Sequence, residues 1–126
     1  MNIDNLINKD KIAIIVVGYN RLKSIKRLLG SLVKAEYPSK YIPLVISIDC
    51  SEDEELYTYV RDFEWPYGEK YLIIQDKRLG LKEHILSCGD LSQYFRAIIL
   101  LEDDLYVSKE FYNYIVATVD KYYNTE

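Results

Sequence analysis

The sequence predicts an α/β fold built on an open, mostly parallel four-stranded sheet with helices on both faces. Two observations lead to this class. Short apolar runs alternate with longer segments in which apolar residues recur at helical spacing, a pattern that favours parallel strands joined by right-handed crossover helices. Polar residues also gather directly after the predicted strands. We expect the strand order 3-2-1-4, with a topological switch between the first and fourth strands.

Each of the four predicted strands is a short apolar run followed by a segment with helical periodicity. The first and fourth runs, IAIIVV and AIILL, are continuously apolar, which is typical of strands buried on both faces. The predicted strands are residues 12–17, 44–48, 71–74 and 97–101. The predicted helices are residues 22–33, 51–63, 81–91 and 108–123.

Capping residues mark the starts of three predicted helices. Asn20 is the expected N-cap of the first helix. Ser51 and Glu54 match a capping box at the start of the second, and Ser108 is the expected cap of the last. The apolar face of that last helix is formed by Phe111, Ile115, Val119 and Tyr122.

The composition is that of an ordinary globular domain and argues against several classes of protein. The chain has 126 residues, 49% of them hydrophobic, and a net charge of −4, which argues against a nucleic-acid partner. Walker A, GxGxxG, GxSxG and zinc-type Cys/His patterns are absent. Residues 1–10 form a polar lead-in without a secretory signal, and residues 11–126 form one domain without a membrane-spanning run. We expect a cytoplasmic protein.

Polar residues follow all four predicted strands, and the parallel arrangement places them at one edge of the sheet. The opposite edge has less concentrated chemistry. In open α/β sheets, ligands bind outside the carboxyl ends of the strands at a topological switch, so the sequence predicts a ligand site there. The candidate residues are Asn20, Arg21, Asp49, Arg78, Lys82, His84, Glu102, Asp103 and Asp104.

The acidic triplet Glu102–Asp104 is the most distinctive of these groups. Three adjacent carboxylates repel one another, and a divalent cation shared with an anionic ligand would relieve that repulsion. The alternative is a solvated loop at the entry to a helix. Asp49 also has two interpretations, because it either contacts a ligand or helps to cap the helix at Ser51. 

The cations and the single histidine have structural alternatives as well. Arg21, Arg78 and Lys82 would face the same cleft, or they are ordinary surface charges. His84 is the only histidine; a lone histidine is more often structural than functional, and its place beside a glycine-containing loop improves the odds of a role at the site.

The order and spacing of these motifs resemble the GT-A glycosyltransferases. The features are GYNR after the first strand (residues 18–21), VISIDC ending near Asp49 (residues 45–50) and IILLEDDL at residues 98–105. The nearest similarity is to the N-acetylglucosaminyltransferase I family, whose DxD motif takes a Glu-Asp-Asp form, with glycosyltransferase family 2 as a broader relative. The resemblance covers about residues 11–121 and implies a Rossmann-like nucleotide-sugar-binding half.

The resemblance also implies a donor, a metal and residue roles. The donor would be a UDP-sugar held with Mn²⁺ or Mg²⁺, and the acceptor a hydroxyl of a glycan or another molecule. Asp104 would ligate the metal, Asp103 would hydrogen-bond the ribose, and Glu102 would support that loop or the sugar. Asp49 would accept a hydrogen bond from the uracil ring nitrogen.

The resemblance also implies roles for Arg21 and His84, and it implies that the catalytic base lies outside this chain. Arg21 would lie near the diphosphate and His84 near the base. In the family, the catalytic base lies well beyond the acidic triplet, and we expect this chain to lack it together with the acceptor-binding part. The chain is then either the donor-binding portion of a glycosyltransferase or a non-catalytic, degenerate module of that fold. An exposed edge at residues 97–101, or the last helix, would favour self-association.

Overall fold

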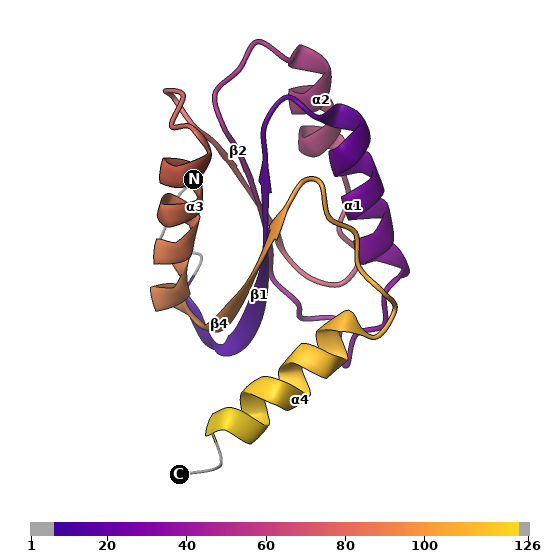
Figure 1. Ribbon diagram of the computed structural model, residues 1–126. Helices are drawn as coiled ribbons and strands as arrows, with labels where there is room; N and C mark the ends of the chain where they lie inside the picture. Colours follow the sequence, from indigo (N-terminus) through magenta and orange to yellow (C-terminus); the bar gives the residue numbers. More distant parts are fainter. Residues whose placement is uncertain (1–6, 124–126) are drawn as a thin grey trace.

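A four-stranded parallel sheet in the order β3-β2-β1-β4 forms the centre of the molecule, with helices on both faces (Figure 1). The computed structural model describes residues 7–123. The predicted class and strand order are confirmed. The elements are β1 (Asn8–Gly18), α1 (Leu22–Lys34), β2 (Leu44–Ile48), α2 (Glu54–Asp62), β3 (Lys70–Ile74), α3 (Leu81–Gly89), a 3-10 helix (Asp90–Tyr94), β4 (Phe95–Glu102) and α4 (Phe111–Tyr123).

Strand β1 is central, because it pairs with β2 on one side and β4 on the other. Residues Ile12–Val17 are buried on both faces, which explains why this run lacks polar residues. The strand begins earlier than predicted, since Asn8 already pairs with Phe95 before an irregularity in register. Residues 8–10, assigned from the sequence to a lead-in, therefore belong to the sheet.

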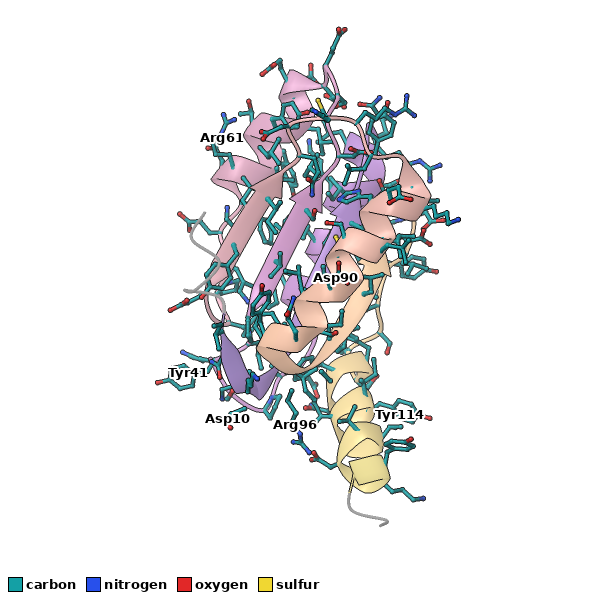
Figure 2. The ribbon with its side chains drawn as sticks, turned by 90° about the vertical axis from the view of Figure 1, so that its left-hand side faces the viewer. Asp10, Tyr41, Arg61, Asp90, Arg96 and Tyr114 are labelled. Carbon is teal, nitrogen blue, oxygen red and sulfur yellow. The ribbon has the colours of Figure 1, made fainter. Side chains whose placement is uncertain are left out.

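Alternate residues of β1 divide the core into two clusters. Ile12, Ile14 and Val16 pack with α1, α2 and part of α4, whereas Ala13 and Val17 face α3. Figure 1 shows α1 and α2 on one side of the sheet and α3 on the other. Figure 2 shows α3 lying across its face of the sheet. Among residues 7–123, no helix is long and apolar enough to cross a bilayer.

Two of the predicted helix caps are wrong because a neighbouring residue takes each position. Asn20 adopts φ 52° in the turn out of β1, a left-handed conformation that asparagine tolerates, and Arg21 occupies the cap position of α1. In α2 the cap is Asp53, whose Oδ1 accepts a hydrogen bond from Leu56 N at 3.0 Å. Ser51 Oγ accepts from Asp53 N instead, so the predicted capping box does not form.

The last helix starts three residues later than predicted, and most of its predicted apolar face is confirmed, because Phe111, Ile115 and Val119 pack against the core. Ser108 lies ahead of α4, where its carbonyl accepts a hydrogen bond from Phe111 N at 3.3 Å. Tyr122, predicted on the apolar face, is 75% exposed, whereas Tyr112 is buried and donates to Ile12 O at 2.8 Å. The third helix also differs, because α3 ends at Gly89 and a 3-10 turn leads into β4.

An aromatic cluster fixes α4 to the body of the fold at the end of the sheet where the strands begin. Tyr37 lies at its centre, with its ring 5.5 Å from Trp65 and 5.3 Å from Tyr112. Tyr67 and Phe111 complete the cluster. The buried polar tips find backbone acceptors, as in the 2.6 Å bond from Tyr37 to Leu32 O.

Candidate functional site

A cavity of about 310 Å³ opens at the carboxyl ends of β1, β2 and β4, where the topological switch predicts a ligand site. Among the predicted candidates, only Asn20 and Lys82 are missing from its lining. The lining residues are Val17, Gly18, Tyr19, Arg21, Asp49, Arg78, Gly80, Leu81, His84, Glu102, Asp103 and Asp104.

The end of β1 packs closely against α1, because Gly18 has no side chain. A Cβ at this position would lie 2.9 Å from Ile25 Cδ1 and 3.7 Å from Asp103 Oδ2. The next residue, Tyr19, donates its backbone N–H to Asp103 Oδ2 at 3.1 Å. Asp103 therefore joins the ends of β1 and β4.

Asp103 is buried, and the Tyr19 N–H and the Arg21 guanidinium partly compensate the cost of burying its charge. Burial raises the pKa of its carboxyl group, while the Tyr19 amide and the Arg21 guanidinium oppose that rise. Arg21 Nη1 lies 3.9 Å from Asp103 Oδ1, and the arginine side chain is 60% exposed. Such a half-solvated ion pair contributes little to stability, so the Arg21 charge remains available to an anionic ligand.

The three carboxylates of the acidic triplet do not converge on one point. Glu102 is half-buried at the end of β4, Asp103 is turned towards β1, and Asp104 is exposed at the cavity. Within residues 7–123, no three His, Cys, Asp or Glu side chains are grouped so as to hold a metal ion. The expectation that the triplet shares a cation with an anionic ligand stays a prediction, with Asp104 as the ligand from this chain. Exposed Asp104 still fits a hard cation that takes its other ligands from water and a diphosphate.

Asp49 ties the end of β2 to the loop between β3 and α3. Its Oδ1 accepts from Cys50 N and Leu79 N, both at 2.8 Å, and its Oδ2 accepts from Gly80 N at 3.0 Å. Burial raises the pKa of this carboxyl group, but the three N–H donors outweigh burial and the net shift is downward. The alternative role as a cap of α2 is wrong, because Asp53 caps that helix.

The loop held by Asp49 carries the second cation of the cavity. The Arg78 guanidinium lies 4.6 Å from the centre of the Tyr19 ring, a cation–π contact. Gly80 then starts α3 with φ 79°, a conformation that glycine adopts without strain. Leu81 and His84, three residues apart on one face of α3, line the cavity, whereas Lys82 points elsewhere and is exposed.

His84 is almost fully buried, at 1% exposure, between α3 and the sheet. Its Nε2 lies 2.8 Å from Ser47 Oγ. Burial lowers the pKa of the imidazole, with Asp49 and Asp103 opposing that shift. Sequence reasoning missed Ser47, although a hydroxyl within the apolar run LVISI signals a buried polar partner.

Comparison with known proteins gives matches among solved structures only. No family model matches the sequence. No curated protein matches it either. S. aureus TarS residues 1–349 in complex with UDP-GlcNAc is 24% identical, with a TM-score of 0.65 over 88% of this chain. The longer S. aureus TarS structure is 22% identical, with a TM-score of 0.67 over 90% of this chain. The mannosyltransferase PcManGT from Pyrobaculum calidifontis, in complex with GDP-Man and Mn²⁺, is 15% identical, with a TM-score of 0.65 over 88% of this chain.

These matches show the fold of the chain. It has the GT-A glycosyltransferase fold, and the narrower resemblance to the N-acetylglucosaminyltransferase I family finds no support among them. The chain spans 31% of the TarS structure with UDP-GlcNAc, 20% of the longer TarS structure and 32% of PcManGT.

Proposed function

We propose that this chain is the donor-binding portion of a glycosyltransferase, which binds a UDP-sugar with Mn²⁺ or Mg²⁺ for transfer of the sugar to a hydroxyl acceptor. The observation that carries the proposal is the convergence of Arg21, Arg78 and Asp104 on one cavity at the topological switch. Two cations beside an exposed carboxylate suit a diphosphate accompanied by a divalent metal. The ligands named for the TarS and PcManGT structures belong to the same chemical class.

The chemistry of sugar transfer explains why these charges belong together. Departure of the sugar leaves negative charge on the diphosphate, and fixed cations stabilise that charge. Arg21, after β1, and Arg78, in the loop before α3, would supply two of them. A divalent cation, when bound, supplies further charge stabilisation, and Asp104 would be its ligand from this chain. Asp103 would accept from the ribose through Oδ1, because its Oδ2 is already used by Tyr19 N–H.

The nucleobase would lie between α3 and the end of β2. Leu81, 63% exposed, offers an apolar surface at the cavity, and His84 lies behind it. Asp49 Oδ2 accepts a hydrogen bond from Gly80 N, and a carboxylate oxygen can accept two. The remaining acceptor position would take the ring N–H of uracil.

A second candidate function is a module that holds UDP without transferring sugar. It is favoured because two of the acidic residues at the cavity already have structural hydrogen-bond partners in the protein backbone. Asp49 and Asp103 are both buried and both accept backbone N–H groups. Both functions require UDP binding, so donor turnover distinguishes them. Release of UDP from a UDP-sugar by the wild type, lost in Asp104→Asn, would exclude the non-catalytic module.

Titration calorimetry with UDP, in Mn²⁺ and in chelator, tests the metal-dependent site. We expect wild type to bind UDP more tightly in Mn²⁺, and Asp104→Asn to lose that dependence because an amide is a weak ligand for a hard cation. The matched control is Asp10→Asn, which removes an exposed carboxylate from the start of β1, away from the cavity (Figure 2). Equal UDP affinity of the wild type in Mn²⁺ and in chelator would refute the metal assignment.

A further inference from the structure

The segment after the acidic triplet runs along α1 on its way to α4 (Figure 1). Leu105 N donates to Glu102 O at 3.0 Å, so the chain turns immediately at Asp104. Leu105 and Tyr106 are 42% and 68% exposed. Val107, the next residue, is partly buried and packs against the core, so the segment is positioned by this apolar contact together with its polar contacts.

Two residues of α1 supply such contacts, on either side of the exposed pair. Arg27 Nη2 donates to the carbonyl oxygen of Asp104 at 3.3 Å. Ser31 Oγ accepts from Val107 N at 3.0 Å and donates to Leu28 O at 2.7 Å. Positions 27 and 31 are four residues apart and lie on the same face of the helix. They therefore hydrogen-bond to the segment at two points, about one helical turn apart along α1.

Arg27 makes a second contact with the same segment, to the ring of Tyr106. Its guanidinium lies 5.3 Å from the centre of the Tyr106 ring, so one side chain contacts both the carbonyl of residue 104 and the aromatic ring of residue 106. A planar guanidinium can donate in its plane and stack through its face, which a lysine ammonium cannot do. The position thus exploits a property specific to arginine.

We propose that Arg27 and Ser31 are positioning residues for the metal-binding end of the donor site, an inference that rests on the proposed function. Asp103 is held by Tyr19 N–H, but Asp104 is exposed, so the direction of its carboxylate depends on the backbone at residue 104. Arg27 of α1 holds the carbonyl of that residue, and the turn from Leu105 N to Glu102 O sets the backbone beside it. Arg21 occupies the cap position of α1, so one rigid element would align both the cation at the diphosphate and the metal ligand.

The test measures UDP affinity by calorimetry in Mn²⁺ and in chelator for Arg27→Ala, Arg27→Lys and Ser31→Ala. The matched control is Lys23→Ala, which removes an exposed positive charge from the same helix. We expect Arg27→Ala to weaken Mn²⁺-dependent binding by about two- to tenfold, the effect of losing one solvent-exposed hydrogen bond, with affinity in chelator unchanged. Arg27→Lys should lose nearly as much, Ser31→Ala should act in the same direction, and Lys23→Ala should match wild type.

The results of these titrations distinguish failure of the positioning role of Arg27 and Ser31 from failure of the proposed donor site. If wild type shows Mn²⁺-dependent binding and both Arg27→Ala and Ser31→Ala retain it in full, the positioning role is wrong and the donor site stands. If these variants weaken binding equally in Mn²⁺ and in chelator, their effect is general and the positioning role is also wrong. If the wild type shows no dependence on Mn²⁺, the metal assignment and the positioning role fail together.

Discussion

Replacing Asp49 by asparagine changes one atom of a buried side chain and tests whether this residue holds the β3–α3 loop in place. An amide can keep its oxygen at the Oδ1 position, where Cys50 N and Leu79 N donate. Its NH₂ group would then face Gly80 N–H, which now bonds to Oδ2 at 3.0 Å, so two donors would oppose each other. The change therefore removes one hydrogen bond outright and weakens two others.

The cost follows from those three bonds. A donor left without a partner costs about 1–3 kcal/mol, and each charge-assisted bond that becomes neutral loses about 1 kcal/mol, with solvent at the loop reducing the sum. We expect Asp49→Asn to lower the free energy of unfolding by about 2–3 kcal/mol, measured by urea denaturation. Asp53→Asn is the matched control, because it makes the same chemical change at the cap of α2, where asparagine caps as well as aspartate.

The pH dependence of the same pair of proteins gives an independent check. The folded pKa of Asp49 is lowered, so its contribution is present above the unfolded pKa and is lost as the pH falls through the folded value. The stability difference between wild type and Asp49→Asn should therefore shrink as the pH falls from about 5 to about 3. A loss no greater than that of Asp53→Asn, or a difference that does not change with pH, would refute this role for Asp49.

Three other predictions concern the fold around the site. Because burial lowers the pKa of His84, its neutral form stabilises the fold above the unfolded pKa of about 6.5. Urea unfolding should show wild type losing stability as the pH falls below that value, and His84→Gln should lack this loss. Gly80→Ala, at φ 79°, should cost about 1–3 kcal/mol, whereas Gly30→Ala, with open space around its Cβ, should be neutral or stabilising by up to about 1 kcal/mol. We also expect self-association through the edge of β4 or through α4, and light scattering that shows only monomer at high concentration would contradict it.

Much of the fold could be predicted because it follows from patterns that a sequence displays directly. The β-branched apolar run at residues 12–17 is typical of a strand covered on both faces, and polar residues after four parallel strands meet at one edge of the sheet. Cap positions were harder, because Ser51 and Asp53 are both good N-caps two residues apart. Only the packing of the finished helix decides between such neighbours.

Helix geometry accounts for the error at Lys82. Residues two positions apart on a helix point to nearly opposite sides, so His84 lines the cavity whereas Lys82 does not. In α4, Phe111, Ile115 and Val119 pack against the core as predicted, but Tyr122 in the last turn is exposed. The contacts of Asp49 involve backbone N–H groups at residues 79 and 80, and every residue type except proline presents such a group, so the sequence does not mark these partners.

The aromatic cluster at the end of the sheet where the strands begin contains an intrinsic fluorophore that can report on the packing of α4. Trp65 is the single tryptophan, is 7% exposed, and donates its indole N–H to Ile42 O at 2.8 Å. Its ring contacts Tyr37, which in turn contacts Phe111 and Tyr112 of α4, so its fluorescence should respond when detachment of α4 disturbs this packing. The cavity has no tryptophan in its lining, so ligand binding there can be titrated with little change in that signal. Loosening of the last helix and occupation of the site can thus be followed separately in one untagged sample.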